Sequence, residues 1–402
     1  MKPSEDNIKE IKALFSKMKT REDLLVLLNR AKELYYGESG TLFEVKSLTY
    51  YSNPKLAKNS YREFPVKKKN GGFRKIHAPV KGLKSIQIIL NFVLQCVFEP
   101  HQAAKGFIWK KSIVDNARVH EGQHYVFNID LKDFFPSVDQ ARVWKRLQYP
   151  PFNLNHENGN LEIANRIAGL CCTEMEVERK NEDGVWETVK LNVLPQGAPT
   201  SPTFTNIIAQ NLDHKLSGLA KRFNLNYSRY ADDITFSSMH NVYQHNSDFR
   251  NELHRIIENQ NFYINPKKTR LQKTGFRQEV TGLVVNNKAN VHQRYLKQIR
   301  MWLYYWERYG YAKAEQIFLK DYAKDKSHVK KGKPGMINVI SGKLEFLKMV
   351  RGFNDDQYIK LESRFDKLIL REKGTPSLEN ILKVWEKEGI EKAIEISNLI
   401  KE

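Results

Sequence analysis

Cysteine is scarce in this 402-residue chain, which contains only Cys96, Cys171 and Cys172. No two of them form a C-x-x-C pair, and a bridge between the adjacent Cys171 and Cys172 would be strained. The sequence therefore predicts neither a disulfide framework nor a zinc site. Three free thiols are typical of a reducing, cytoplasmic setting.

Long hydrophobic runs are also missing. The most apolar stretch, residues 86–98, is interrupted by Gln87, Asn91 and Gln95. It is too short and too polar to span a bilayer, so it predicts a buried helix. The first six residues contain no apolar signal region. We therefore expect no membrane partner.

Acidic residues are in the minority: 46 Asp and Glu stand against 66 Lys and Arg, a formal net charge of +20. Such an excess favours a polyanionic partner, although a merely soluble basic surface is the alternative. Between Asn265 and Arg300 there are nine basic residues and one acid, with aromatic residues interleaved there and just beyond. Positive charge combined with stacking surface suits nucleic acid better than a membrane.

Three carboxylates stand out among the acids that are present. Asp232 and Asp233 lie in the tetrad Tyr-Ala-Asp-Asp, whose β-prone flanks predict a hairpin with both carboxylates at its turn. Asp130 lies in a strand-like run over residues 126–135. Together they could hold two divalent ions about 3.5–4 Å apart, as in phosphoryl transfer. The alternative is that the adjacent pair consists of ordinary solvated turn residues.

A second hairpin is predicted over residues 64–79, because Asn70-Gly71 separates two strand-like runs. Lys67 to Lys69 form either a solvated tip that discourages edge pairing or a ligand contact. Arg74 lies closer to the strand face, where its planar fork could grip a triphosphate. Residues 194–202, rich in proline and small residues, precede a helix whose amide groups favour phosphates.

Hydrophobic periodicity predicts a mixed chain of helices and hairpins. We expect helical segments over residues 1–55, 83–98, 140–148, 161–175, 203–223, 248–260, 295–320, 337–350 and 356–370. A loop is expected over residues 151–160, a hairpin over 176–193, a strand pair over 280–291 and a mobile basic loop over 324–335. Thr375-Pro376-Ser377 predicts the cap of a final helical pair.

The order of these segments over roughly residues 20–370 resembles a reverse transcriptase. Two shorter sequences resemble motifs of one group of these enzymes. Residues 116–120, Asn-Ala-Arg-Val-His, match an N-A-x-x-H box, and residues 280–282 match a Val-Thr-Gly triplet. With these two boxes, the chain resembles the bacterial retron enzymes in particular. For His120 a hydrogen-bonded core position is the alternative. No family function is carried onto the tail after residue 370.

The resemblance implies an α+β right-hand polymerase fold with fingers, palm and helical thumb. The expected domains are an N-terminal helical segment (1–55), fingers (56–125), palm (126–264, with finger-side insertions near 150–193), palm end and thumb (265–370) and a helical C-terminal tail (371–402).

The same resemblance implies the roles of the site residues. Asp130, Asp232 and Asp233 would be catalytic and, with the Leu131 carbonyl, would hold two Mg²⁺ ions. The nucleotide-binding residues would be Arg74, Lys75, Leu131, Phe135, Gln196 and Lys268. Phe135 would exclude a 2′-hydroxyl from the sugar site, and packing in the core is its alternative, because Phe134 is adjacent and only one of the two can face the site.

The implied RNA-binding residues are Asn116, His120, Val280, Thr281, Gly282, Arg294, Lys297, Arg300, Lys330 and Lys331. The implied partners are a cognate structured noncoding RNA, its DNA product, deoxynucleoside triphosphates and an effector protein. A retron enzyme makes a branched RNA–DNA hybrid and serves in defence against phage. Two alternatives stay open: another bacterial reverse transcriptase, such as a group II intron type, and a non-catalytic RNA-binding scaffold.

Overall fold

A computed structural model describes residues 3–37, 41–53, 56–67, 71–325, 334–373, 384–386 and 389–399. The chain divides into two compact units, Met1–Thr281 and Gly282–Glu402. Most of the predicted basic loop, including Lys330 and Lys331, lies outside the described residues, as does the predicted cap at Thr375.

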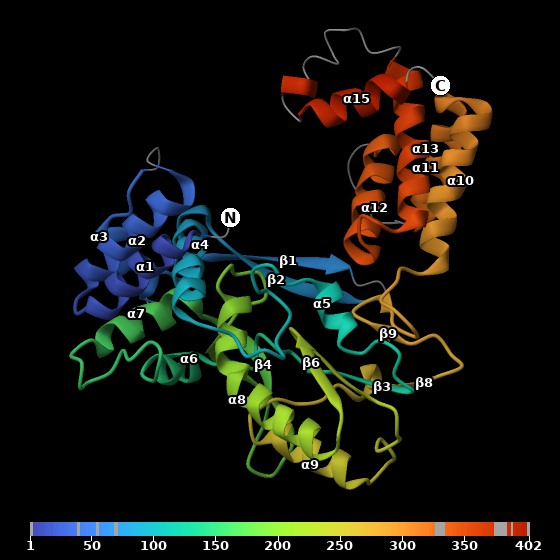
Figure 1. The fold of residues 1–402 in the computed structure, drawn as a ribbon. Coiled ribbons are helices and arrows are strands. Elements are labelled where there is room, and N and C mark those ends of the chain that lie inside the picture. Colours follow the sequence, from blue (N-terminus) through green and yellow to red (C-terminus); the bar gives the residue numbers. More distant parts are fainter. Residues whose placement is uncertain are drawn as a thin grey trace. The chain divides into compact units, whose positions relative to one another are not determined.

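The first unit begins with helices that form one side of its core. They are α1 (Glu5–Lys17), α2 (Arg21–Tyr36), α3 (Val45–Ser52), α4 (Lys81–Val97) and α7 (Leu161–Cys171), drawn together in Figure 1. Thr20 starts α2 with a capping box, in which its side chain and that of Asp23 each accept a backbone N–H of the other residue. Buried Leu24, Leu28 and Leu90 join these helices in one core.

A two-stranded ribbon, β1 (Tyr61–Lys67) and β2 (Phe73–Pro79), lies between α3 and α4 in the chain. The ribbon docks on the loop before α8 (Ser201–Arg222), where the His77 amide donates to the Gln196 carbonyl over 2.9 Å. Gly197 makes this approach possible, because a Cβ there would lie 2.6 Å from the His77 carbonyl oxygen. Its φ of 131° also favours glycine.

The centre of the first unit is a four-stranded antiparallel sheet of order β6-β7-β3-β8. Its strands are β3 (Tyr125–Asp130), β6 (Asn226–Tyr230), β7 (Asp233–Ser238) and β8 (Arg270–Lys273). Phe127 pairs with Phe236 and Ile129 with Ile234, so one face is apolar. That face packs in the core with α8 and α9 (Asp248–Glu258), which lie together below the sheet in Figure 1.

The opposite face of the sheet is polar and carries Asn128, Thr235 and Ser237. The short helix α5 (Ile113–Arg118) lies against it and begins with a Ser112 capping box. The three-residue helix η1 (Pro266–Lys268) lies between α9 and β8. The sheet therefore separates an apolar helical layer from the side on which the candidate site lies.

A long hairpin of β4 (Thr173–Lys180) and β5 (Trp186–Val193) follows α6 (Gln140–Leu147) and α7. The hairpin and its turn at Asn181–Val185 agree with the prediction over residues 176–193. The predicted helix over residues 161–175 is wrong at its end, because the chain turns extended at Cys172 and Thr173 already pairs with Val193. The β-branched and alternating residues from Thr173 to Val177 favour the strand.

The second unit begins with β10 (Leu283–Val284), which follows β9 (Glu279–Val280) of the first. After a loop over residues 285–292, its described elements are helices. Its helices are α10 (Gln293–Tyr309), α11 (Tyr311–Asp325), α12 (Met336–Arg351), α13 (Asp356–Lys373) and α15 (Ile390–Leu399). The helical region predicted over residues 295–320 is split by Gly310, whose φ is 74°. Trp302 packs edge-on against Phe318 in the core.

The α+β prediction is confirmed by this combination of helices with an antiparallel sheet. None of the helices in the described ranges is long and apolar enough to cross a bilayer.

Candidate active site

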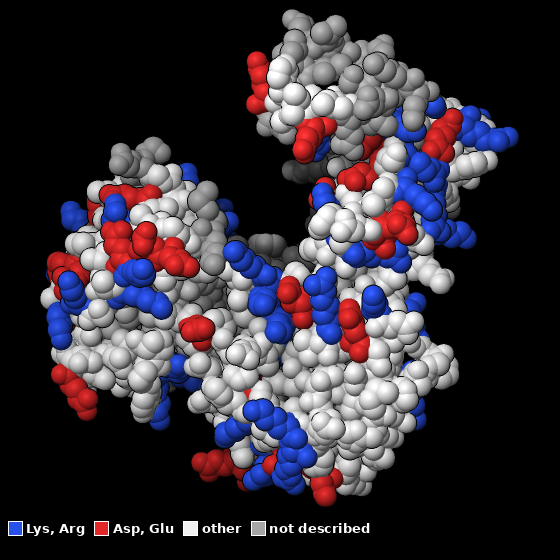
Figure 2. Space-filling view, in the orientation of Figure 1, with Lys and Arg blue, Asp and Glu red and all other residues white. Residues whose placement is uncertain are grey.

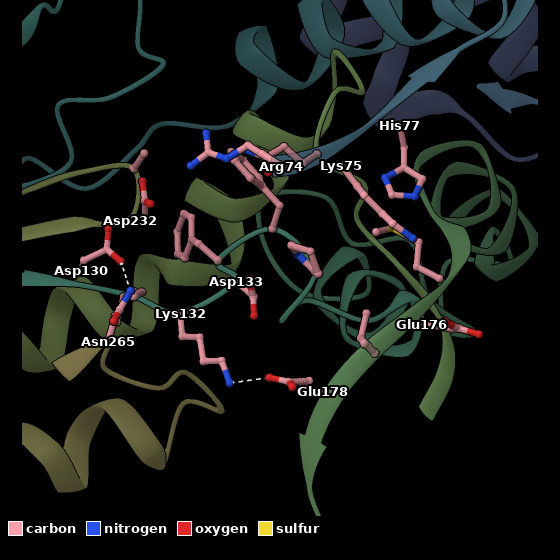
Figure 3. A pocket seen from close by; sticks show the side chains of 18 of the residues that line it. Arg74, Lys75, His77, Asp130, Lys132, Asp133, Glu176, Glu178, Asp232 and Asn265 are labelled. Carbon is pink, nitrogen blue, oxygen red and sulfur yellow. Dashed lines mark hydrogen bonds and ion pairs between the residues drawn. The ribbon is translucent and has the colours of Figure 1, made fainter. Parts of the chain in front are cut away.

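A cavity of about 1160 Å³ opens between the β1–β2 ribbon, the end of β3 and the β4–β5 hairpin. Figure 3 shows the side chains of these elements pointing into it. All three predicted catalytic aspartates line this cavity. So do all the residues predicted to bind nucleotide: Arg74, Lys75, Leu131, Phe135, Gln196 and Lys268.

The three carboxylates meet because of strand register. β3 pairs with β7 so that Asp130 lies directly opposite Asp233. Asp232 lies in the turn, where its carbonyl accepts the Leu131 amide over 3.0 Å. The turn depends on Ala231, which adopts a positive φ of 57°. Asp130 and Asp233, 103 positions apart in sequence, are thereby fixed side by side, as the tetrad and the Asp130 strand predicted.

Burial and mutual repulsion raise the pKa values of two carboxyl groups in this cluster. Desolvation raises the pKa of Asp233 to about 6, and the nearby charges of Asp232 and Asp130 reinforce the rise. Burial and then Asp130 also raise the pKa of Asp232, against the smaller opposing effects of Lys268 and Arg74. The cluster is therefore a concentration of negative charge that a cation would stabilise.

Lys268 and Asn265 supply the partners of Asp130. The Lys268 ammonium lies 2.7 Å from Asp130 Oδ2, and the Asn265 amide donates to Oδ1 over 3.1 Å. Burial alone would lower the pKa of Lys268, but Asp130 outweighs it and the pKa is raised. Asn265 was missed in the sequence, although it stands three residues before Lys268.

The donor chemistry of these carboxylates suits a divalent ion of the Mg²⁺ type, which prefers oxygen ligands. In the described part of the chain no three His, Cys, Asp or Glu side chains are arranged to hold a metal ion. Asp130 is instead directed to Lys268 and Asn265. The three carboxylates are therefore of the right chemical type for such an ion, and Asp130 is paired with Lys268 in this structure.

The opposite wall of the cavity carries positive charge. Arg74 and Lys75 belong to β2, and Figure 3 shows the Arg74 guanidinium extending toward the side where Asp232 lies. Both side chains are exposed, so they are accessible to a ligand. The β4–β5 hairpin forms another wall, held by Lys132, which lies 2.5 Å from Glu178 and 4.0 Å from the Trp186 ring centre.

Phe134 and Phe135 both line the cavity, with ring centres 5.8 Å apart, but they differ in burial. Phe134 is buried against Phe262 in the core. Phe135 is half-buried, lines the cavity and packs near Phe107 at 6.3 Å between ring centres. Of the two rings, Phe135 is therefore the one more accessible to a sugar, and its role in sugar selection stays a prediction.

Arg229, which precedes Tyr230, supports the turn that carries Asp232 from the helical side and was missed in the sequence. Its guanidinium is fully buried and forms a bidentate ion pair with Asp213 of α8, at 2.8 and 2.6 Å. One nitrogen also donates to the Asn206 side chain and to the Ala231 carbonyl, each over 3.1 Å. Burial opposes this charge, but Asp213 keeps the pKa of Arg229 above its usual value.

The turn is also supported by a close backbone approach at Gly106. A Cβ at Gly106 would lie 2.8 Å from the Ala231 nitrogen, and the Asn206 amide donates to the Gly106 carbonyl over 2.9 Å. The signal for this support in the sequence is faint. Asn206 and Asp213 are seven residues apart, so they interrupt the apolar face of α8 at a helical period.

The described residues that were predicted to bind RNA differ in exposure. Arg294, Lys297 and Arg300 are exposed on α10, at a spacing of three residues that places them along one side of the helix. Figure 2 shows basic side chains gathered where α10 lies in Figure 1. Gly282 is exposed, whereas Val280 is buried.

Asn116 and His120, also predicted to bind RNA, lie in the interior, each with 0% of its surface exposed. Their assignment to RNA binding stays a prediction, and their burial confines it to an indirect role in this conformation.

Comparison with known proteins shows to which family this chain is similar. A family model described as reverse transcriptase (RNA-dependent DNA polymerase) matches residues 66–292. The retron Mx162 reverse transcriptase of Myxococcus xanthus is 37% identical over 239 residues, which are 56% of this chain and 47% of the relative. The retron Ec86 reverse transcriptase of Escherichia coli is 34% identical over 248 residues, 60% of this chain and 68% of the relative.

A second Myxococcus xanthus protein, the retron Mx65 reverse transcriptase, is 34% identical over 64% of this chain and 59% of its own length. The match thus spans about half the length of the two Myxococcus relatives. Among solved structures, telomerase from Candida albicans in complex with a telomeric RNA fragment has a TM-score of 0.39 and 12% identity, over 86% of this chain and 69% of that one.

Replacing Asp233 by Asn should stabilise the metal-free protein at neutral pH. The raised pKa means that the folded state favours the protonated carboxyl. The cost of the charge is therefore absent below the unfolded value near 3.8 and fully present above about 6. In a chelator, D233N should unfold at a higher temperature than the wild type at pH 8 and at nearly the same temperature at pH 4. An equal shift at both pH values would contradict this origin.

Replacing Arg229 by Lys should destabilise the first unit by about 2–4 kcal/mol, because an ammonium cannot bond Asp213, Asn206 and the Ala231 carbonyl together. The matched control is Arg222→Lys, since Arg222 is exposed and pairs with Glu252. The control should stay within about 0.5 kcal/mol of the wild type. Urea unfolding measures both, and equal effects would show that the buried fork is dispensable.

Proposed function

The chain belongs to the reverse transcriptase family, within its bacterial retron branch, and from that membership we propose that it makes branched, RNA-linked single-stranded DNA from its own noncoding RNA. The reaction proposed is RNA-directed DNA polymerisation: a primer hydroxyl attacks the α-phosphate of a deoxynucleoside triphosphate, and pyrophosphate leaves.

One observation supports this proposal above the others. Asp130, Asp232 and Asp233 share a cavity of about 1160 Å³ with Arg74 and Lys268. The volume is large enough for a nucleotide beside the end of a primer. Carboxylates on one wall and cations on another suit a substrate that carries phosphates and a metal. In a binding protein without catalysis, three carboxylates that repel each other would have no function that offsets their repulsion.

Two Mg²⁺ ions would be held by Asp130, Asp232 and Asp233 with the Leu131 carbonyl, and when bound they activate the primer hydroxyl and neutralise the triphosphate. The chain's own residues do the rest. Arg74, with Lys75 beside it, grips the triphosphate by charge-assisted hydrogen bonds. Lys268 moves from Asp130 to the phosphates and can donate a proton to the leaving pyrophosphate.

Selection of the substrate falls to the remaining walls. Phe135 packs against the sugar and excludes a 2′-hydroxyl, while Gln196 borders the base. Gln196 is held in place because its carbonyl accepts the His77 amide. This hydrogen bond connects the β1–β2 ribbon to the proposed nucleotide pocket.

The template is proposed to be a structured RNA bound by shape and backbone charge, as dispersed Lys and Arg residues allow. Arg294, Lys297 and Arg300 are the described candidates for that surface. The fingers, palm and thumb are assigned to residues 56–125, 126–264 and 265–370. We also propose that synthesis starts from an internal 2′-hydroxyl, that the protein has an effector partner and that it serves in anti-phage defence.

Replacing Asp232 by Asn should abolish primer extension on an RNA template with Mg²⁺ and leave RNA binding within about twofold, because a metal ligand is lost while the basic surface is not. Asp183→Asn makes the same change at the exposed tip of the β4–β5 hairpin and should extend primers normally. Extension by D232N at the wild-type rate would refute the site. A wild type that binds RNA without extending primers would refute the polymerase.

Replacing Phe135 by Ala should admit ribonucleotides, because the ring that would meet a 2′-hydroxyl is gone. The preference for deoxynucleotides, measured as a ratio of kcat/KM values, should fall by about tenfold or more. Phe73→Ala is the matched control, since Phe73 also lines the cavity but is 67% exposed. An unchanged preference in F135A would remove Phe135 from this role.

A further inference from the structure

Two boxes that lie far apart in sequence are joined inside the first unit. The N-A-x-x-H box contributes Asn116 and His120, and the Val-Thr-Gly triplet contributes Thr281. Asn116 and His120 are each 0% exposed, and both make side-chain hydrogen bonds to the central sheet. The Asn116 amide is 3.5 Å from Thr281 Oγ1, which itself donates to the Ile113 carbonyl over 3.3 Å.

Both ring nitrogens of His120 have hydroxyl partners. Nδ1 lies 2.7 Å from Ser237 Oγ and Nε2 lies 2.7 Å from Ser228 Oγ. Ser228 donates its only hydroxyl proton to Asn116 Oδ1 over 2.8 Å. It must therefore accept from Nε2–H, which leaves Nδ1 to accept from Ser237. One neutral tautomer satisfies every group, and burial lowers the pKa of His120 to about 3, which keeps the ring uncharged.

The two serines lie on the strands that carry the catalytic turn. Ser228 is on β6, four residues before Asp232, and Ser237 is on β7, four residues after Asp233. Both side chains face away from the apolar helical layer, because they alternate with Arg229 and Phe236 along their strands. His120 thus bridges the two arms of the catalytic hairpin.

We propose that the two boxes form one internal strut, made of Asn116, His120, Ser228, Ser237 and Thr281, which fixes the catalytic hairpin to α5 and to the turn at Thr281. Asn116 and His120 are positioning residues in this strut and do not touch RNA. The strut is an addition to the proposed polymerase function, and its activity readout rests on that function, whereas its stability readout does not.

A polar strut explains features that simple core packing leaves unexplained. Apolar side chains of the same volume would fill the space without fixing a direction, whereas a fully bonded network accepts one arrangement of its members. Thr281 adopts a φ of 47°, a conformation in which a β-branched residue is strained. Its hydroxyl contacts with Asn116 and Ile113 offset that strain, which gives a reason for threonine at this position.

The first variants remove single hydroxyls from the strands and leave both boxes intact. The variants are Ser228→Ala and Ser237→Ala, with Ser238→Ala as the matched control. Ser238 is also a buried serine of β7, but it bonds the His240 carbonyl and Tyr243 outside the strut. A fourth variant, His120→Ala, is combined with Ser228→Ala in a double-mutant cycle read by thermal unfolding.

The strut predicts that S228A and S237A slow primer extension at saturating nucleotide by about tenfold or more, well below their unfolding temperatures, because the aspartates are displaced. S238A should extend within about twofold of the wild type, although it also loses hydrogen bonds. All three should bind a DNA-primed RNA hairpin within about twofold. In the cycle, S228A and H120A should lower the unfolding temperature by less together than the sum of their separate effects.

Three results would overturn the strut. The first is extension by S228A at the S238A rate. The second is an additive double-mutant cycle. The third is a loss of about tenfold or more in hairpin binding in H120A but not in S228A, which would assign His120 to direct RNA contact. If the wild type itself extends no primer, the polymerase proposal fails, and the unfolding cycle alone still decides whether the strut exists.

Discussion

The pairing of β3 with β7 is the constraint on which the site depends. Its register sets Asp130 opposite Asp233, an arrangement of like charges that weakens a sheet. The fold accepts this because the apolar residues of the same strands, such as Phe127 and Phe236, are buried in the core. Lys268 then supplies the nearest positive charge. Hydrophobic burial on one face thus maintains an electrostatically unfavourable cluster at the end of the strands.

The hairpin that carries Asp232 and Asp233 is hydrogen-bonded on both faces by different chemistry. On the helical side, Arg229 forms a charged fork with Asp213 and bonds the Ala231 carbonyl. On the other side, His120 forms an uncharged bridge between two serines. Every group in both networks is hydrogen-bonded, which is the condition under which buried polar groups specify one geometry. Both networks therefore favour one geometry of the hairpin, while Asp232 and Asp233 line the cavity.

Much of this site could be predicted because the signals are local. The Tyr-Ala-Asp-Asp hairpin and the Asp130 strand depend on residues adjacent in the chain. The role of Arg229 could not be predicted, because a charged side chain is buried only where a partner such as Asp213, distant in sequence, pairs with it. The burial of His120 was left open for the same reason. The helix predicted through Met175 failed because the chain alternates in a strand pattern from Thr173, where it pairs with Val193.

Gly106 and Gly197 have no side chain to offer, yet each lets one segment of backbone touch another beside the cavity. In a saturation mutagenesis map of this protein, both positions would score as intolerant as Asp130, Asp232 and Asp233. A reader of that map who equated intolerance with chemistry would count two catalytic residues too many. Direct measurement of folded protein for each variant is what separates the two classes, because the glycine variants would be lost from the soluble fraction while the aspartate variants accumulate.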